Sequence, residues 1–421
     1  MADQEDSLER LNMETHDSVE SMTIEKAMAE IVKYPRVEGT ENLPIADCIG
    51  RVLAEDVVAL DAVPTYASSA MDGYAFCYSD AKSGKRLQLQ GRVPAGYPLS
   101  EPLAPERAVR IFTGGMMPVG ADTVAMQEDC LADDLSVQLP TTLSVGANCR
   151  PAGDDIEQGS RVLVSGTRLR PQDIGLAASV NRAVLSVHRR LKVGLATTGD
   201  ELRAPGDTLP PGCIRDSNRH AIGAALRALG AEVTDYGIVP DNRMQIRNIL
   251  ARAAAENDIV FSTGGVSVGD EDHVRPAVQE IGSLMFWRLP IKPGRPVAVG
   301  QIEGTPFVGL PGNPVSVMIA FWLIGRPLLL HLSGASNLHA ARFPVTAAFG
   351  HKRNPGRREF LRGRLYLDDA GAACVTAYRS SSSGMLSSLT WSEGLIEISE
   401  DQGDIHQGDR VQFVPYTGLT S

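Results

Sequence analysis

Cysteine and histidine are scarce in this sequence, and neither residue is spaced for metal binding. The chain has six cysteines and eight histidines in 421 residues, and no two cysteines form a C-x-x-C pair. Zinc clusters need closely spaced ligands and disulfide frameworks need cysteine-dense chains, so we expect scattered core thiols and neither kind of site. No Ser-His-Asp constellation is apparent either, which argues against nucleophilic hydrolysis.

Positive charge and long apolar runs are also in short supply. The formal net charge is −11, and nucleic-acid backbones are held by clustered Lys and Arg that such a chain lacks overall. An anionic small ligand would need a local basic pocket. We find no uninterrupted apolar run long enough to cross a bilayer, and the N-terminus lacks the basic and apolar regions of a secretion signal. The composition predicts a cytoplasmic protein with neither a membrane nor a nucleic acid as partner.

Local patterns divide the chain into several domains, as its length leads us to expect. Ser21 or Thr23 can cap an early helix, Pro171 can begin another, and short β-like runs separated by Gly and Pro lie between them. The β-like runs therefore form an insertion. The predicted division is a disordered tail (1–20), an N-terminal α+β domain (21–60 and 157–190), an inserted β module (61–156), an α/β domain (191–335) and a C-terminal β domain (336–421).

The α/β domain is predicted from strands that alternate with helices, a pattern typical of a parallel sheet with crossover helices. Apolar stripes at 221–229 and 246–253 mark two of these helices. Beyond residue 336 the pattern is β-like again, which predicts a small barrel or sandwich. The six strands of the sheet are expected at 192–197, 232–239, 258–262, 284–288, 296–300 and 305–310.

A glycine pair follows the third of these strands. In an open parallel sheet, ligands bind beyond the carboxyl ends of the strands. Glycines there let backbone N–H groups turn towards a phosphate, so Gly264, Gly265 and Ser267 are candidate phosphate or pterin contacts. A glycine pair by itself is more often only a tight turn.

Three acidic residues also follow strand ends. Asp241 and Asp272 stand where a helix begins, and either one alone is better interpreted as a helix cap. Glu201 alone would be a surface loop residue. Because the three strand ends meet at one edge of the sheet, the carboxylates can instead converge on a hard cation such as Mg²⁺.

A basic cluster, WRLPIKPGRP, carries Arg288, Lys292 and Arg295. Its prolines keep the segment extended, which limits how far the cationic groups can spread. It is either a solvated charged loop or a site for an anionic ligand. In the β module, Asp72-Gly73 is compatible with a simple turn.

Taken in order, SAMDGYA, GDDI, TGDEL, DSNR, GGVSVGDEDH, IKPGRP and LPGNPVS closely resemble the motifs of MoeA-type molybdopterin molybdenumtransferases, a family that includes the C-terminal domain of gephyrin. The resemblance runs from about Met22 to the end of the chain. It implies an elongated homodimer of four-part subunits. Each would have a MogA/MoaB-like parallel-sheet α/β domain, an inserted small β module, an N-terminal α+β linker domain and a C-terminal β-barrel.

The resemblance also implies a reaction. Family members bind adenylylated molybdopterin and molybdate, release AMP, and place molybdenum on the dithiolene sulfurs with a divalent cation such as Mg²⁺ present. Other cofactor-biosynthesis proteins and molybdoenzymes are implied as further partners. Asp72 and Asp155 match acids of the β module that, in this family, reach the cleft of the partner subunit.

The remaining site residues follow from the same resemblance. Asp241, Asp272, Lys292 and Arg288 match residues of the catalytic cleft, and Glu201, Asp241 and Asp272 match its metal ligands. Arg288 stands where we expect Lys, and Gly384 where a basic residue is common. The matched substrate contacts are Gly264, Gly265, Ser267, Ser217, Arg295, Pro311, Gly312, Asn313, Arg358 and Ser383.

Two other functions compete with molybdenum insertion. One is a non-catalytic, gephyrin-like scaffold, which would have no need of the five acids Asp72, Asp155, Glu201, Asp241 and Asp272. The other is a MogA-like molybdopterin adenylyltransferase, which the extra β domains and SAMDGYA disfavour.

Overall fold

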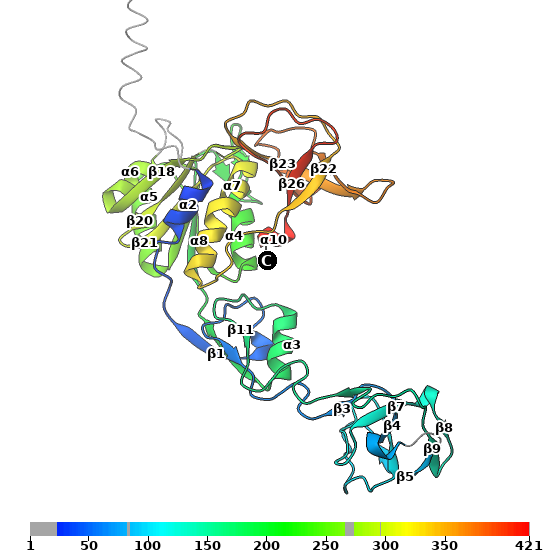
Figure 1. Ribbon diagram of the computed structural model, residues 1–421. Coiled ribbons are helices and arrows are strands. Elements are labelled where there is room, and N and C mark those ends of the chain that lie inside the picture. Colours follow the sequence, from blue (N-terminus) through cyan, green and yellow to red (C-terminus); the bar gives the residue numbers. More distant parts are fainter. Residues whose placement is uncertain (1–22, 82–84, 266–272, 295, 421) are drawn as a thin grey trace, which may run out of the picture.

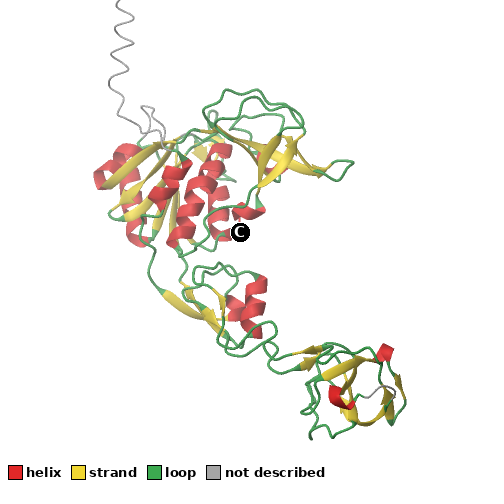
Figure 2. Ribbon diagram, viewed as in Figure 1, coloured by secondary structure: helices red, strands yellow, loops and turns green. Residues whose placement is uncertain are grey.

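The computed structural model describes residues 23–81, 85–265, 273–294 and 296–420. The chain forms an elongated molecule (Figure 1). The α/β domain and a β-barrel lie side by side at one end, a small linker domain lies in the middle, and a β module lies at the far end. Figure 2 shows that helices are concentrated around the large sheet, whereas the β module is almost entirely strand and loop.

The linker domain is built from two short strand pairs and a helix. Strand β1 (Thr40–Pro44) pairs antiparallel with β12 (Val184–His188), and β2 (Val57–Val58) pairs with β11 (Arg161–Leu163). Helix α3 (Pro171–Ser179) has proline at its first position, as predicted. The domain is thus made of two chain segments that flank the β module.

The first described helix, α2 (Ile24–Ile31), does not pack with the linker domain. Thr23 caps it by accepting a hydrogen bond from Lys26 N at 3.2 Å, as the sequence predicts. Its buried face, Ile24, Ala27 and Ile31, belongs to the core of the α/β domain. The helix therefore covers the large sheet, although it was predicted with the N-terminal α+β domain.

The β module contains a six-stranded sheet. Its strand order is β7-β4-β6-β5-β9-β8. Strands β3 (Ser68–Ser69) and β10 (Cys149–Arg150) pair antiparallel outside this sheet. The strands of the sheet are β4 (Gly73–Phe76), β5 (Arg86–Val93), β6 (Arg107–Ile111), β7 (Thr123–Met126), β8 (Leu131–Ala132) and β9 (Ser136–Gln138).

The α/β domain has a six-stranded sheet in the order β16-β13-β17-β21-β20-β18. Five strands run in one direction, and β20 is antiparallel to both of its neighbours. The reason is the two-residue turn Glu303-Gly304, whose φ angles of 50° and 91° suit a tight hairpin. The strands are β13 (Lys192–Thr198), β16 (Glu232–Val239), β17 (Ile259–Thr263), β18 (Gly282–Arg288), β20 (Pro296–Ile302) and β21 (Thr305–Leu310).

Helices cover both faces of this sheet. Helices α5 (Arg243–Glu256) and α6 (Val274–Ile281) share one core cluster with the sheet. Helix α4 (Asn218–Ala228) and the long helix that follows β21 share the other with α2. The helices follow apolar stripes that the sequence predicts for α4 and α5. The carboxyl ends of β13, β17 and β21 are left open at one edge.

The long helix after β21 is a strongly apolar segment of the α/β domain. It comprises α7 (Pro314–Ala320), a π-helical turn (Phe321–Gly325) and α8 (Arg326–Leu332). Within the described residues, this 19-residue stretch is long and apolar enough to cross a membrane, although Arg326 interrupts its apolar run. It is 94% buried inside the protein, as expected for the central helix of a core.

The C-terminal domain is a closed barrel. Its strands follow the order β23-β24-β22-β26-β25, and β23 also pairs with β25, which closes the ring. The structure thus decides for a barrel over a sandwich. Strand β19 (Ile291–Lys292) of the α/β domain pairs parallel with β23 and ties the two domains together. The barrel strands are β22 (Phe343–Ala347), β23 (Arg358–Leu367), β24 (Ala373–Ala377), β25 (Gly394–Ile398) and β26 (Arg410–Pro415).

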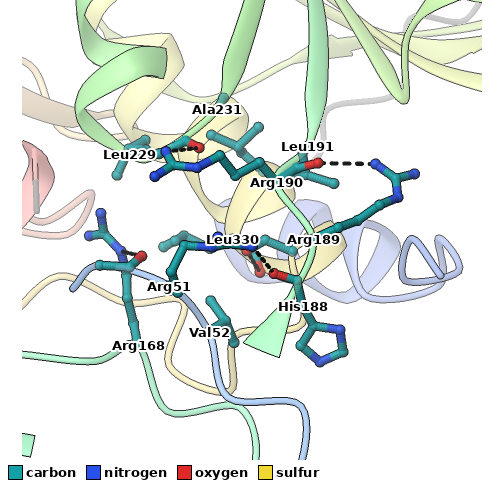
Figure 3. A pocket seen from close by; sticks show the side chains of 14 residues that line it. Arg51, Val52, Arg168, His188, Arg189, Arg190, Leu191, Leu229, Ala231 and Leu330 are labelled. Carbon is teal, nitrogen blue, oxygen red and sulfur yellow. Dashed lines mark hydrogen bonds between the residues drawn. The ribbon is translucent and has the colours of Figure 1, made fainter. Parts of the chain in front are cut away.

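Arginines hold the linker domain to the α/β domain (Figure 3). Arg189 makes two hydrogen bonds of 2.7 Å to Asp258 of the α/β domain. Arg51 donates to the carbonyl of His188 at 2.8 Å on the linker-domain side of the junction. Arg190 donates to the carbonyl of Gly230 just beyond α4. The cavity among these residues measures about 30 Å³, which is enough for a water molecule or two. We therefore interpret this junction as structural.

Candidate functional site at the edge of the sheet

A cleft of about 520 Å³ opens at the carboxyl edge of the parallel strands. Loops after β13, β16, β17 and β21 form one side of it, and the β19 segment and the barrel form the other. This is the place where open α/β sheets bind ligands. The residues that line the cleft are Thr198, Gly199, Glu201, Asp241, Gly264, Gly265, Ile291, Lys292, Pro293, Gly294, Pro296, Pro311, Gly312, Asn313, Ser316, Arg357 and Ser383.

The glycine pair after β17 lines the cleft and cannot carry side chains. Gly264 and Gly265 have φ angles of 83° and 64°, which only glycine adopts readily. A Cβ on Gly264 would lie 2.7 Å from the carbonyl oxygen of Thr198, and one on Gly265 would lie 2.8 Å from the Thr198 hydroxyl. That hydroxyl is buried and has no hydrogen-bond partner in the described structure. The floor of the cleft therefore combines a bare backbone turn with an unpaired polar oxygen.

Two carboxylates, Glu201 and Asp241, form the acidic side of the cleft. Asp241 is not the cap of α5, which corrects the simplest interpretation of its position. The next residue, Asn242, caps that helix by accepting a hydrogen bond from Gln245 N at 3.1 Å. Oδ2 of Asp241 instead accepts a hydrogen bond from Asp200 N at 3.1 Å. The carboxylate of Asp241 therefore lines the cleft and does not cap the helix.

The described residues contain no group of three His, Cys, Asp or Glu side chains that could hold a metal. The third predicted ligand, Asp272, lies outside the described residues, as do Ser267 and Arg295. The backbone of Arg288 ends β18, but its side chain is likewise outside the description. The structure therefore brings together two of the three predicted metal ligands and leaves the third unplaced.

Lys292 and Arg357 form the basic side of the cleft. Lys292 follows β18 and pairs in register with Glu359 of the barrel. Its Nζ lies 3.4 Å from Oε2 of Glu359. The peptide bond between Lys292 and Pro293 is cis. The cleft therefore has carboxylates on one side and cations on the other.

Arg358, the predicted substrate contact, does not reach this cleft. Its guanidinium pairs with Glu25, Glu397 and Glu400 at 3.0 to 3.3 Å and lines a separate cavity under the barrel. Burial acts to lower the pKa of Arg358, but these carboxylates outweigh it and raise that pKa. The preceding residue, Arg357, lies in the bend just before β23 and lines the cleft instead.

Nine of the predicted residues line the cleft directly. They are Glu201, Asp241, Gly264, Gly265, Lys292, the three consecutive residues Pro311, Gly312 and Asn313, and Ser383 from the barrel. Ser217 precedes α4 and is not part of the lining, but its neighbour Asn218 donates a hydrogen bond of 2.6 Å to the carbonyl of Gly312.

Sequence reasoning missed eight lining residues, and three of these, Thr198, Ser316 and Arg357, have polar side chains. Ser316 lies inside the motif LPGNPVS, so the motif already contained the signal. The loop that bears Ser383 is fixed near it, because Val315 N donates to the carbonyl of Ser383 at 3.0 Å. Thr198 ends β13 and opens the motif TGDEL, but its buried hydroxyl, without a partner among the described residues, is visible only in the structure.

Asp72 and Asp155 belong to the β module, which lies at the opposite end of the molecule from the cleft (Figure 1). Oδ1 of Asp72 accepts hydrogen bonds of 2.8 Å from both the backbone N–H and the hydroxyl of Thr113. These bonds, the backbone one first, lower the pKa of Asp72 and keep it ionised. Neither acid contributes to the cleft of its own subunit.

Comparison with known proteins connects these features. Models of the MoeA N-terminal region (domain I and II), of a probable molybdopterin binding domain and of the MoeA C-terminal region (domain IV) match residues 22–181, 194–331 and 344–416. A molybdopterin molybdenumtransferase of Haemophilus influenzae is 34% identical over 94% of this chain and 99% of its own length. One of Nostoc sp. is 34% identical over 90% of this chain and 89% of its own length.

The fold agrees with these matches. The crystal structure of the molybdopterin biosynthesis MoeA protein from Pyrococcus horikoshii OT3 superposes with a TM-score of 0.80 at 29% identity. The superposition covers 94% of this chain and all of that one. The three consecutive family matches, the full-length relatives and the shared architecture lead to one conclusion: this chain belongs to the MoeA family of molybdopterin molybdenumtransferases.

Proposed function

We propose that the chain is an enzyme that transfers molybdenum from molybdate into adenylylated molybdopterin, releases AMP and forms molybdenum cofactor. The observation that carries this proposal is the cleft itself, in which Glu201 and Asp241 face Lys292 and Arg357 across a glycine turn. A substrate with a phosphoanhydride and an oxyanion needs cationic contacts, and a hard cation needs carboxylates. The cleft has both, in a volume suited to a small molecule.

The basic side binds the anionic parts of the substrates. Lys292 supplies a point charge, whereas the planar guanidinium of Arg357 can donate two parallel hydrogen bonds to an oxyanion. Ser316 and Ser383 add hydroxyls beside these cations. The predicted Arg288 and Arg295 would extend the same basic side. Charge that develops on the leaving AMP is thereby stabilised by groups already held in place.

The oxygen ligands on the acidic side fit a divalent cation. Glu201 and Asp241 offer carboxylate oxygens, and the Thr198 hydroxyl beside them is buried without a partner among the described residues. We infer that Glu201 and Asp241, with Asp272, would hold Mg²⁺, which would neutralise charge on the anhydride oxygens when bound. The protein's own part is to hold Glu201 and Asp241 at the edge of the cleft where the substrate would bind.

The working unit in this proposal is a homodimer. Asp72 and Asp155 lie far from the cleft of their own subunit, so they can act only in the cleft of a second one. The pKa of Asp72 is lowered by Thr113, which suits a carboxylate that works in its ionised form. The predicted cytoplasmic location and the further protein partners stay predictions.

The direct test is an assay of the purified protein with adenylylated molybdopterin, molybdate and Mg²⁺. We expect AMP and molybdenum cofactor in equal amounts, each dependent on molybdate. Formation of adenylylated product from ATP and free molybdopterin would indicate an adenylyltransferase instead. Failure to restore molybdoenzyme activity in an insertase-deficient cell, with the protein folded and present, would indicate a scaffold.

A further inference from the structure

The barrel contains a buried carboxylate directly behind the basic side of the cleft. Glu359 is 2% exposed and lies in β23, the barrel strand that pairs with β19. Its Oε2 accepts from His351 Nε2 at 2.9 Å and lies 3.4 Å from Lys292 Nζ. Its Oε1 lies 3.5 Å from Nε of the buried Arg353. Glu359 does not itself line the cleft.

Only one of these three partners of Glu359 belongs to the cleft. His351 and Arg353 are barrel residues, and neither is part of the cleft lining, whereas Lys292 is. His351 and Arg353 hold the carboxylate in one place, because a buried acid with several polar partners around it has little freedom to move. Lys292 has a flexible four-carbon side chain that is 43% exposed, and a fixed counter-charge restricts it.

We propose that Glu359 is a positioning residue for Lys292: a barrel carboxylate, anchored by His351 and Arg353, holds the cleft lysine at the place where it meets the anionic substrate. The barrel thereby contributes to the reaction without touching the substrate. This inference rests on the proposed function, because it takes Lys292 to act on the anionic substrate.

The expected kinetic effect is specific. In Glu359→Gln the ammonium of Lys292 keeps its charge but loses its fixed partner, so attraction of the anion persists while orientation is lost. We expect kcat to fall roughly tenfold, with the KM for adenylylated molybdopterin within about twofold of wild type. A general structural defect would not separate kcat from KM in this way.

A double-mutant cycle with Lys292→Met tests whether Glu359 acts through Lys292. We expect Lys292→Met to lower kcat roughly 100-fold and the double variant to be no worse than Lys292→Met alone. Glu359→Asp, which keeps the carboxylate on a shorter side chain, should recover part of the rate. It also keeps the test usable if Glu359→Gln folds poorly, which the thermal unfolding midpoint of each variant reveals.

Glu397 offers a matched control. It is also a buried barrel glutamate, 8% exposed, but it pairs with Arg342 and Arg358, neither of which lines the cleft. Glu397→Gln should change kcat less than about twofold and combine with Lys292→Met as an independent effect. Independent effects of Glu359→Gln and Lys292→Met in an active enzyme would overturn this inference alone. An inactive wild-type protein would overturn the proposed function and this inference with it.

Discussion

Asp200 and Asp241 each accept a hydrogen bond from the backbone N–H of the other. Asp200 N donates to Asp241 Oδ2, and Asp241 N donates to Asp200 Oδ1, both at 3.1 Å. The two residues follow different strands, β13 and β16, so this reciprocal pair joins two loops at the edge of the sheet. Oδ2 of Asp241 accepts the bond that joins the loops, and the carboxylate also lines the cleft.

The first prediction concerns Asp241→Asn. The amide oxygen can still accept from Asp200 N, so the protein should fold with a thermal midpoint close to wild type. Loss of the negative charge should lower AMP release from adenylylated molybdopterin at least about 100-fold. The measurement is AMP formed by the purified variant. The control is Asp207→Asn, at an exposed position outside the cleft lining. Undiminished AMP release by Asp241→Asn would contradict the proposed role of Asp241 in the reaction.

The second prediction separates Arg357 from Arg358. Arg357→Ala removes a cation from the cleft and should raise the KM for molybdate roughly tenfold, with little change in stability. Arg358→Ala leaves Glu397 and Glu400 without one of their partners and should lower the free energy of unfolding by about 1–3 kcal/mol. Its KM should stay near wild type. Steady-state kinetics and urea unfolding of both variants are the measurements. A raised KM in Arg358→Ala and an unchanged KM in Arg357→Ala would show that Arg358 is the substrate contact.

The third prediction concerns the glycine turn. An alanine at Gly264 would place its Cβ 2.7 Å from the Thr198 carbonyl oxygen at a φ of +83°. We expect Gly264→Ala to cost about 1–3 kcal/mol of stability and to weaken substrate binding. Gly175→Ala is the control, because no atom lies within 4 Å of its added Cβ in α3, and it should stabilise by about 0.5–1 kcal/mol. Equal effects of both substitutions on binding would contradict the assigned role of the turn.

The fourth prediction is a pH dependence at the linker junction. Burial acts to raise the pKa of Asp258, but Arg189 and the N–H of Lys192 outweigh it, so that pKa is lowered. The ionised carboxylate therefore contributes stability above its unfolded pKa of about 3.9, and this contribution disappears as the pH falls through the lowered folded value. Asp258→Asn should cost about 1–2 kcal/mol at pH 7.

Urea unfolding of wild type and Asp258→Asn at several pH values is the measurement. The difference in unfolding free energy between them should shrink as the pH falls below about 4. A difference that stays constant down to pH 3 would show that Asp258 does not act through its charge.

The fifth prediction tests the shared cleft. Asp72→Asn and Asp241→Asn should each be inactive alone. After the two are unfolded and refolded together, half of the dimers carry both variants, and each of these has one intact cleft. The mixture should therefore recover about a quarter of the wild-type rate. A mixture no more active than its components would show that Asp72 does not serve a second subunit.

Much of the architecture could be predicted from residue order alone. The strand from Glu232 to Val239 was predicted with the bounds that the structure has, and the caps and apolar stripes of α2 and α4 follow local rules. The glycine turn and Asp241 were located because parallel strands put their carboxyl ends at one edge. These features depend on periodicity and on conformations that only certain residues adopt.

Which side chains line the cleft depends on packing between segments that are distant in the sequence. Arg358 begins β23 and pairs with glutamates of α2 and of the barrel, whereas Arg357, in the bend before the strand, lines the cleft. The position of Lys292 depends on Glu359, which is 67 residues away. The sequence by itself determined the elements, the family motifs and the edge of the sheet where the site lies. Only the tertiary structure decided which side chains meet there, because contacts between distant residues depend on how the domains pack.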